Sequence, residues 1–281
     1  MKCFVCEGDM SSYMTKKYPY TGLIDEAVFL KCENCGMVIN ETMYELSPEK
    51  WKELNLKLHK QYQGMDYVEG DPKWITRLRS QAKVLFGMFS IGLLKTDMNC
   101  VDYGCGDGKL SDYVDELLAD STARGIVKKY DKFMSNAHGG RDKGYLTEGE
   151  IKEKAFDVVI TCSVFEHLVG LDDVDYIIKL LNPNCGVLGV HTLVCEDVPQ
   201  DENWFYIDFP MHCTIWTNKA MKKLFELYRF KGCAYHLEAQ MWFFFYDEAM
   251  FVKLKKFHKN IPGSWFFSNE FVDYWKQKPY R

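Results

Sequence analysis

From residue 99 onward, short runs of apolar residues alternate with segments in which apolar residues recur every three or four positions. The run at residues 156–162 is nearly continuous, which is typical of a parallel strand that is covered on both faces. The strands that such runs predict lie at residues 100–103, 125–130, 156–162, 186–194, 233–237 and 241–246. Amphipathic helices are expected at residues 109–119, 172–181 and 217–228. Alternation of this kind predicts a doubly wound α/β sheet.

The first 95 residues follow a different pattern. A short strand is expected at residues 27–31, and Ser47, followed by proline, predicts the start of a helix because its hydroxyl can cap the first turn. Asp71, also followed by proline, predicts the start of a second helix. We therefore expect three parts: a small module at residues 1–45, a helical connector at 46–95 and the α/β domain at 96–281.

Four of the eleven cysteines form two C-x-x-C pairs near the N-terminus, each followed closely by glycine. Such paired thiolates can converge on one metal ion, and the glycines allow the backbone to turn tightly beneath the sulfurs. Four sulfur ligands favour zinc in a closed site with a structural role. The segment resembles a zinc ribbon, with expected ligands Cys3, Cys6, Cys32 and Cys35.

Composition and charge narrow the class of protein. The 281 residues are 47% hydrophobic and carry a formal net charge of -5, which indicates a globular protein and argues against nucleic acid as the main partner. No apolar run reaches the roughly 20 residues of a membrane helix, and the N-terminus lacks the apolar core of a signal peptide. The seven single cysteines are expected to behave as small buried hydrophobes in a reducing compartment, so we expect a cytoplasmic protein.

A glycine-rich turn follows the first predicted strand of the α/β domain, where residues 101–108 read V-D-Y-G-C-G-D-G. Glycines at this place let the backbone approach a ligand closely, and Asp102 can accept a hydrogen bond from a cationic ligand group. Asp131 ends the second strand, where an acidic residue can bind a ribose diol. A nicotinamide fingerprint would need glycine where Lys109 stands, and the Gly-Lys-Ser/Thr of a P-loop is absent.

These residues resemble the class I S-adenosylmethionine-dependent methyltransferases over residues 99–237. The resemblance rests on residues 101–108, Asp131, residues 156–168 (F-D-V-V-I-T-C-S-V-F-E-H-L) and residues 181–188. It implies a Rossmann-like methyltransferase sheet and S-adenosylmethionine as cofactor. The residues that it implies for cofactor binding are Asp102, Gly104, Cys105, Gly106, Gly108, Asp131, Ser163 and Val164.

A long connection at residues 195–216 is expected to contact the methyl acceptor, because long loops in compact domains are often functional. Its aromatic run, followed by Pro-x-His, resembles small-molecule and glycan methyltransferases. His212 is the candidate base for a hydroxyl, and Glu166 and His191, at strand ends, are further catalytic candidates. His167 is expected to pack structurally.

The sequence therefore predicts a methyltransferase that O-methylates a saccharide or nucleotide-linked sugar in polysaccharide or secondary-metabolite biosynthesis. Two alternatives stay open. The first is RNA base methylation, because a zinc module before such a domain also resembles one type of ribosomal RNA guanine methyltransferase. The second is a non-catalytic zinc-ribbon adaptor, which the intact glycine turn disfavours. The oligomeric state is open.

Overall fold

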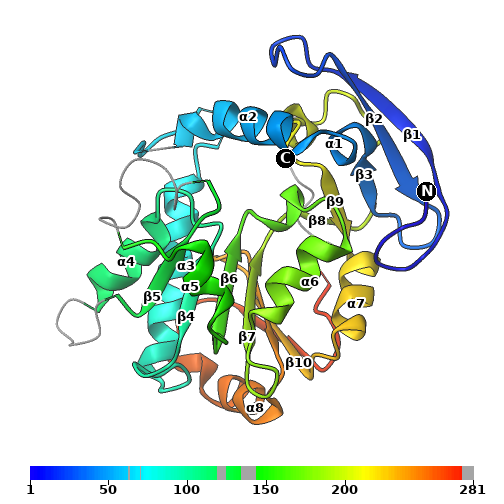
Figure 1. Ribbon diagram of the computed structural model, residues 1–281. Coiled ribbons are helices and arrows are strands. Elements are labelled where there is room, and N and C mark those ends of the chain that lie inside the picture. The colour runs from blue at the N-terminus through cyan, green and yellow to red at the C-terminus, as the bar shows by residue number, and fades with distance from the viewer. Residues whose placement is uncertain (63, 70, 119–124, 134–143, 274–281) are drawn as a thin grey trace.

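The computed structural model describes residues 1–62, 64–69, 71–118, 125–133 and 144–273. Its main sheet has seven strands in the order β12-β10-β11-β7-β6-β4-β5 (Figure 1). The strands β5, β4, β6 and β7 pair in parallel, whereas β11 pairs antiparallel with β7 and with β10, and β10 pairs antiparallel with β12. The strands are β4 (Cys100–Tyr103), β5 (Val127–Tyr130), β6 (Val158–Cys162), β7 (Val187–His191), β10 (Gly232–His236), β11 (Met241–Phe245) and β12 (Trp265–Ser268). The predicted doubly wound α/β sheet is confirmed.

Helices cover both faces of this sheet because its central strands are apolar on both sides. Val158 and Ile160 face one core, while Val159, between them, faces the other. The first core is covered by α3 (Trp74–Ser90), α4 (Lys109–Leu117) and α8 (Glu248–Phe257). The second is covered by α5 (Glu148–Lys152), α6 (Leu171–Lys179) and α7 (Asn218–Leu227). Residue 119, the predicted end of the helix that became α4, lies outside the described residues.

The predicted strand at 186–194 is two strands in two different sheets. β7 ends at His191, and β8 (Val194–Cys195) belongs to a second sheet of five strands in the order β1-β2-β3-β9-β8. The other strands of this second sheet are β1 (Met10–Lys17), β2 (Glu26–Cys32), β3 (Val38–Asn40) and β9 (Thr214–Thr217). The cysteine module and the long connection after β7 therefore share one sheet.

The link between these two segments is an antiparallel pairing in which Val38 lies opposite Ile215 and Ile39 opposite Thr214. Next to β3, the short helix α1 (Glu41–Tyr44) leads to α2 (Pro48–His59), which lies across the top of Figure 1. The Ser47 hydroxyl accepts a hydrogen bond from the Lys50 amide, so the predicted cap of α2 is confirmed. Within the described residues, no helix combines the length and apolar character needed to cross a membrane.

Trp216 joins the second sheet to the main sheet, which gives a test of the junction. Its side chain is fully buried, its indole nitrogen donates to the Phe165 carbonyl oxygen at 2.9 Å, and its ring meets that of Phe4 edge-on at 5.9 Å. We expect Trp216→Ala to lower the free energy of unfolding by about 3–5 kcal/mol, measured by urea denaturation, because it leaves a cavity and removes the indole hydrogen bond.

Phe205→Ala is the control, since this aromatic side chain is 55% exposed and its removal should cost less than about 1 kcal/mol. Equal losses in the two variants would contradict the proposed stabilising role of the junction.

Candidate active site

A cavity of about 1810 Å³ opens at the carboxyl ends of the parallel strands. Its walls come from the turns that follow β4, β5, β6 and β7, from α2 and α3, and from the connection that precedes β9. Ligands bind at this edge in doubly wound sheets, because loops there diverge to either face. The location predicted for the site is therefore the location of the cavity.

The glycine turn after β4 is held in a conformation that other residues adopt with strain. Gly104 and Gly106 have φ angles of 70° and 56°, and a Cβ atom on Gly104 would lie 2.7 Å from Cγ2 of Val164. The Gly104 amide donates to the Tyr130 carbonyl oxygen at 2.7 Å. Both glycines and Cys105 line the cavity.

Gly108 has a different position from the other predicted glycines. It is the N-cap residue of α4 with φ 80°, and a Cβ atom on it would lie 2.6 Å from Cδ of Lys129. Its preference for glycine therefore comes from the positive φ at the start of the helix, and Gly108 is not among the described residues that line the cavity.

Two carboxylates lie at the same end of the cavity. Asp102 is 2% exposed, and burial, together with the charge of Asp131, raises its pKa to about 7. Asp131 accepts a hydrogen bond from the Gly106 amide at 3.1 Å. A Cβ atom on Gly106 would meet nothing within 4 Å, so the cavity leaves open space between the turn and these acids. Paired carboxylates beside an open glycine turn fit a cofactor that carries a sulfonium cation and a ribose diol.

Ser163 and Val164, the residues predicted after β6, also line the cavity. Ser163 has φ 56°, an uncommon conformation for a residue with a side chain, and its amide donates to the His191 carbonyl oxygen at 2.9 Å. This turn directs the chain into the short 3-10 helix η3 (Phe165–His167). Glu166 and His167 lie in this helix and also line the cavity.

Four histidines line the cavity, and we call them the histidine wall: His59, His167, His191 and His212. In each, Nδ1 donates to a backbone carbonyl oxygen, so that Nε2 keeps its lone pair. The acceptors are Asn55 at 3.1 Å, Met211 at 2.7 Å, Gln240 at 2.7 Å and Tyr206 at 2.7 Å, respectively. Burial lowers the pKa of His59 and His167 to about 4 and that of His191 to about 3, and it lowers the pKa of His212 as well. The wall is therefore uncharged at neutral pH.

Glu166 lies against this wall and is 3% exposed. Its Oε2 accepts a hydrogen bond from the Thr192 hydroxyl at 2.7 Å, and burial raises its pKa to about 7. The ligand atoms offered by Glu166, His167 and His212 all lie within 4.8 Å of one another. The structure thus brings together two of the predicted catalytic residues with His167, for which only packing was expected.

Two residues at the site were not singled out in the sequence analysis. His59 ends α2, and its side chain lines the cavity. The Tyr145 hydroxyl donates to the carbonyl oxygen of Gly106, in the glycine turn, at 2.8 Å. Neither residue belongs to a recognisable motif, so only spatial proximity identifies them.

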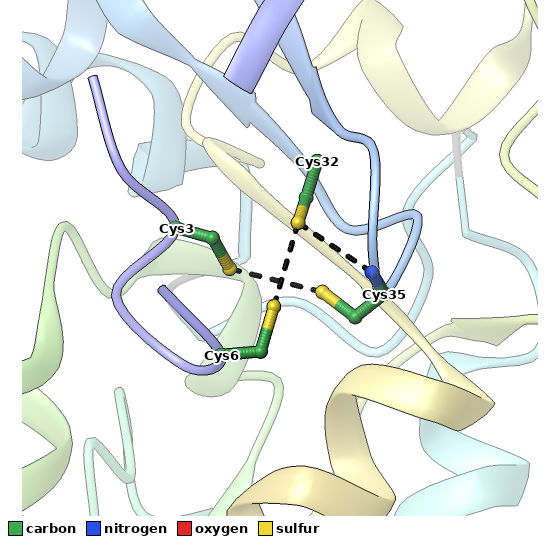
Figure 2. A group of neighbouring side chains, drawn as sticks. All are labelled: Cys3, Cys6, Cys32 and Cys35. Atoms are coloured by element: carbon green, nitrogen blue, oxygen red, sulfur yellow. Dashed lines mark hydrogen bonds between the residues drawn. The ribbon is translucent and has the colours of Figure 1, made fainter. Parts of the chain in front are cut away.

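The N-terminal cysteines converge as their spacing predicted (Figure 2). The sulfur atoms of Cys3 and Cys35 are 3.7 Å apart, those of Cys6 and Cys32 are 3.5 Å apart, and all four lie within 4.8 Å of one another. Four sulfurs bonded to one zinc ion at about 2.3 Å would be about 3.8 Å apart in a tetrahedron. The four thiols therefore fit a zinc ion.

The methyltransferase domain family matches this chain over residues 76–233. The chain belongs to this family. The protein is thus a class I S-adenosylmethionine-dependent methyltransferase, as the glycine turn and the residues after β6 predicted. None of the curated proteins compared with the chain matches it.

Several solved structures are similar to the chain at low identity. The plantazolicin methyltransferase BpumL in complex with S-adenosylhomocysteine and a monoazolic substrate analogue is 13% identical, with a TM-score of 0.48 over 71% of this chain and 81% of its own. The plantazolicin methyltransferase BamL is 14% identical, with a TM-score of 0.47 over 79% and 83%. Magnesium protoporphyrin IX methyltransferase from Synechocystis PCC 6803 is 11% identical, with a TM-score of 0.43 over 70% and 96%.

The raised pKa of Asp102 predicts how cofactor affinity depends on pH. The ionised carboxylate attracts the cofactor's positive charge, so the affinity for S-adenosylmethionine should rise between pH 6 and pH 8 as Asp102, with a pKa of about 7, loses its proton. Asp102→Asn should bind about tenfold more weakly at pH 8, a loss of about 1.4 kcal/mol, and show a flatter pH profile in isothermal titration calorimetry.

Asp172→Asn is the matched control, because this carboxylate lies in the exposed first turn of α6 and does not line the cavity. It should bind the cofactor as the wild type does. Identical pH profiles for the wild type and Asp102→Asn would refute the role of Asp102.

Proposed function

We propose that this methyltransferase methylates a hydroxyl group of a saccharide or nucleotide-linked sugar. The observation that carries the proposal is the second part of the cavity, where aromatic side chains lead to the histidine wall. A cavity of about 1810 Å³ holds more than one ligand of ordinary size, since single-ligand pockets occupy about 300–1,000 Å³. It has room for an acceptor beside the cofactor.

Aromatic rings form much of the acceptor side. They come from α2, from the start of α3 and from the connection before β9, and they include Trp51, Trp74, Phe205, Tyr206 and Phe209. The negative faces of such rings pack against the C–H surfaces of sugars. Phe205 is 55% exposed within this lining, which leaves its ring available to a ligand.

Lysines at the cavity mouth support an acceptor with a negatively charged group. Lys17, Lys52 and Lys73 line the cavity. By contrast, Lys16 and Lys57, also in the lining, are engaged by Asp208 at 2.8 Å and by the Thr21 carbonyl oxygen at 2.6 Å. Ammonium groups beside an aromatic channel fit the diphosphate of a nucleotide-linked sugar. This charge favours the nucleotide-linked sugar over a neutral glycan.

Methyl transfer requires that the methyl donor and the acceptor hydroxyl are aligned and that one group accepts the hydroxyl proton. S-adenosylmethionine supplies the methyl group when bound. The acceptor oxygen forms its bond to the methyl carbon while the carbon–sulfur bond breaks and its electron pair stays on sulfur, leaving S-adenosylhomocysteine. The hydroxyl proton passes to an Nε2 atom of the histidine wall, whose lone pairs are available because each Nδ1 donates to a carbonyl.

The proposal is tested by methyl transfer to a panel of nucleotide sugars, oligosaccharides and RNA, read by mass shift. We expect transfer to a nucleotide sugar, and on that acceptor His212→Ala should lower kcat by about 100-fold or more while leaving the dissociation constant of S-adenosylmethionine unchanged.

His258→Ala is the control for this variant. The Nδ1 atom of His258 also donates to a carbonyl oxygen, that of Lys255 at 2.8 Å, but the half-buried His258 is not among the residues that line the cavity. Methylation of RNA alone would overturn the saccharide proposal. Full turnover by His212→Ala would overturn the role of His212.

We also propose that Cys3, Cys6, Cys32 and Cys35 hold a structural zinc ion. Support comes from the sulfur separations and from the attachment of the site to the rest of the protein, since the Thr217 hydroxyl donates to the Cys35 carbonyl oxygen at 2.6 Å. Zinc would thereby stabilise the strands beside the acceptor connection. Thiolate ligands persist in a reducing compartment, so we place the protein in the cytoplasm.

Cobalt substitution tests the zinc site. The Co²⁺ form of the wild type should show thiolate-to-cobalt charge-transfer absorption, and Cys35→Ser should weaken this absorption and lower the melting temperature. Cys185→Ser, at a single cysteine far along the chain, should leave both unchanged. Unaltered charge-transfer absorption in Cys35→Ser would remove Cys35 from the ligand set.

A further inference from the structure

We propose that Glu166, His167 and His212 bind a divalent transition-metal ion at the acceptor end of the cavity. The binding site stands on the geometry of these three residues alone. The use of the ion, to activate the acceptor hydroxyl, rests on the proposed function. This metal site is distinct from the four cysteines, because those sulfurs close on one ion, whereas this cluster lines the cavity.

The three residues come from two segments that the fold presses together. Glu166 and His167 are neighbours in η3, and His212 lies in the turn between η4 (Phe205–Asp208) and β9. Their ligand atoms lie within 4.8 Å of one another. An ion with bond lengths of about 2.1 Å joins ligand atoms that are about 3–4 Å apart. Side-chain movements of about 1 Å would bring the three ligand atoms to the separations that such bond lengths require.

Both histidines make the hydrogen bond through Nδ1 that histidine ligands of metal ions commonly make. Metal-binding histidines almost always donate their second ring nitrogen to a carbonyl oxygen or carboxylate, which fixes the ring and leaves the other nitrogen free to bind. Here Nδ1 of His167 donates to Met211 and Nδ1 of His212 donates to Tyr206, each at 2.7 Å. The Thr192 hydroxyl holds one oxygen of Glu166 at 2.7 Å in the same supporting role.

The buried carboxylate is a second and independent observation. Glu166 is 3% exposed, and the cation whose charge reaches it, Arg77, is paired with Asp71 at 2.7 Å; among the described residues no lysine or arginine lies at ion-pair distance from Glu166. A buried carboxylate without a cation is costly, and proteins resolve that cost by pairing it or by binding a metal ion. A divalent cation between Glu166 and two uncharged imidazoles provides the missing positive charge.

The donor set indicates which ion fits and what it would do. Two imidazole nitrogens and one carboxylate oxygen favour first-row transition metals over Mg²⁺ or Ca²⁺, which prefer oxygen ligands. Three protein ligands leave coordination positions open toward the cavity, where the acceptor oxygen would bind and become more acidic. With Nε2 of His167 and of His212 bound to the ion, the member of the histidine wall that would accept the released proton is His59, whose ring lies 5.1 Å from that of His167 and whose Nδ1 donates to the Asn55 carbonyl oxygen.

The test measures metal binding directly on the full-length protein with its cysteine site loaded with zinc. Mn²⁺ is the probe, because it prefers nitrogen and oxygen ligands to thiolates. Titration followed by electron paramagnetic resonance should show one bound Mn²⁺ per chain, with nitrogen hyperfine coupling from imidazole. His212→Ala and Glu166→Gln should each weaken binding by at least tenfold, and Thr192→Val, which removes only the supporting hydroxyl, by about 10–100-fold.

His258→Ala and Cys185→Ser are the controls, since neither side chain lines the cavity, and both should bind Mn²⁺ as the wild type does. Absence of bound Mn²⁺ at millimolar concentration, or binding that His212→Ala leaves unchanged in a folded protein, would overturn the site. Methyl transfer that persists after this metal is removed, with the cysteine zinc still present, would overturn the activating role but leave the proposed function standing. Bound metal without transfer to any sugar would refute the proposed function and not the site.

Discussion

The structure depends on how the buried carbonyl groups after β6 are hydrogen-bonded. The chain leaves the main sheet at Ser163, so the carbonyl groups of η3 lose the ladder partners they would have in a strand, and a buried carbonyl without a donor is costly. The segment before and within β9 supplies the donors. The Cys213 amide donates to the Glu166 carbonyl oxygen at 2.8 Å, and the Thr214 hydroxyl donates to that of Leu168 at 2.6 Å. Residues that carry the candidate chemistry are therefore held by the strand that joins the two sheets.

The N-terminal module gains its role from this arrangement. β3 pairs with β9, and Thr217 binds the Cys35 carbonyl oxygen, so the cysteine site and the acceptor side of the cavity are parts of one sheet (Figures 1 and 2). A closed zinc site has no open position for chemistry. Its contribution would be to hold β9 in place, and through β9 the carbonyl groups of η3 and the position of His212.

The cavity has two electrostatic halves that suit two different ligands. At the cofactor end, Asp102 and Asp131 provide negative charge beside a glycine turn. At the other end, buried histidines stay neutral because burial lowers their pKa, and the buried carboxylate of Glu166 lies against them. The short segment from Ser163 to His167 lines both halves, so in the proposed mechanism one strand end would position the methyl donor and the group that activates the acceptor.

Local pattern in the sequence was enough to predict the strands of the main sheet except β12, together with the glycine turn and the four converging cysteines. The periodicity of apolar residues decides which faces of a strand are buried, and two C-x-x-C pairs can meet on one ion through a short hairpin. The pairing of β3 with β9, the splitting of the predicted strand at 186–194 between two sheets, and the meeting of His59, His167 and His212 were decided only by the tertiary structure. These contacts join segments far apart in the chain, and a lone histidine after an apolar stripe has the same local pattern whether it packs in a core or lines a cavity.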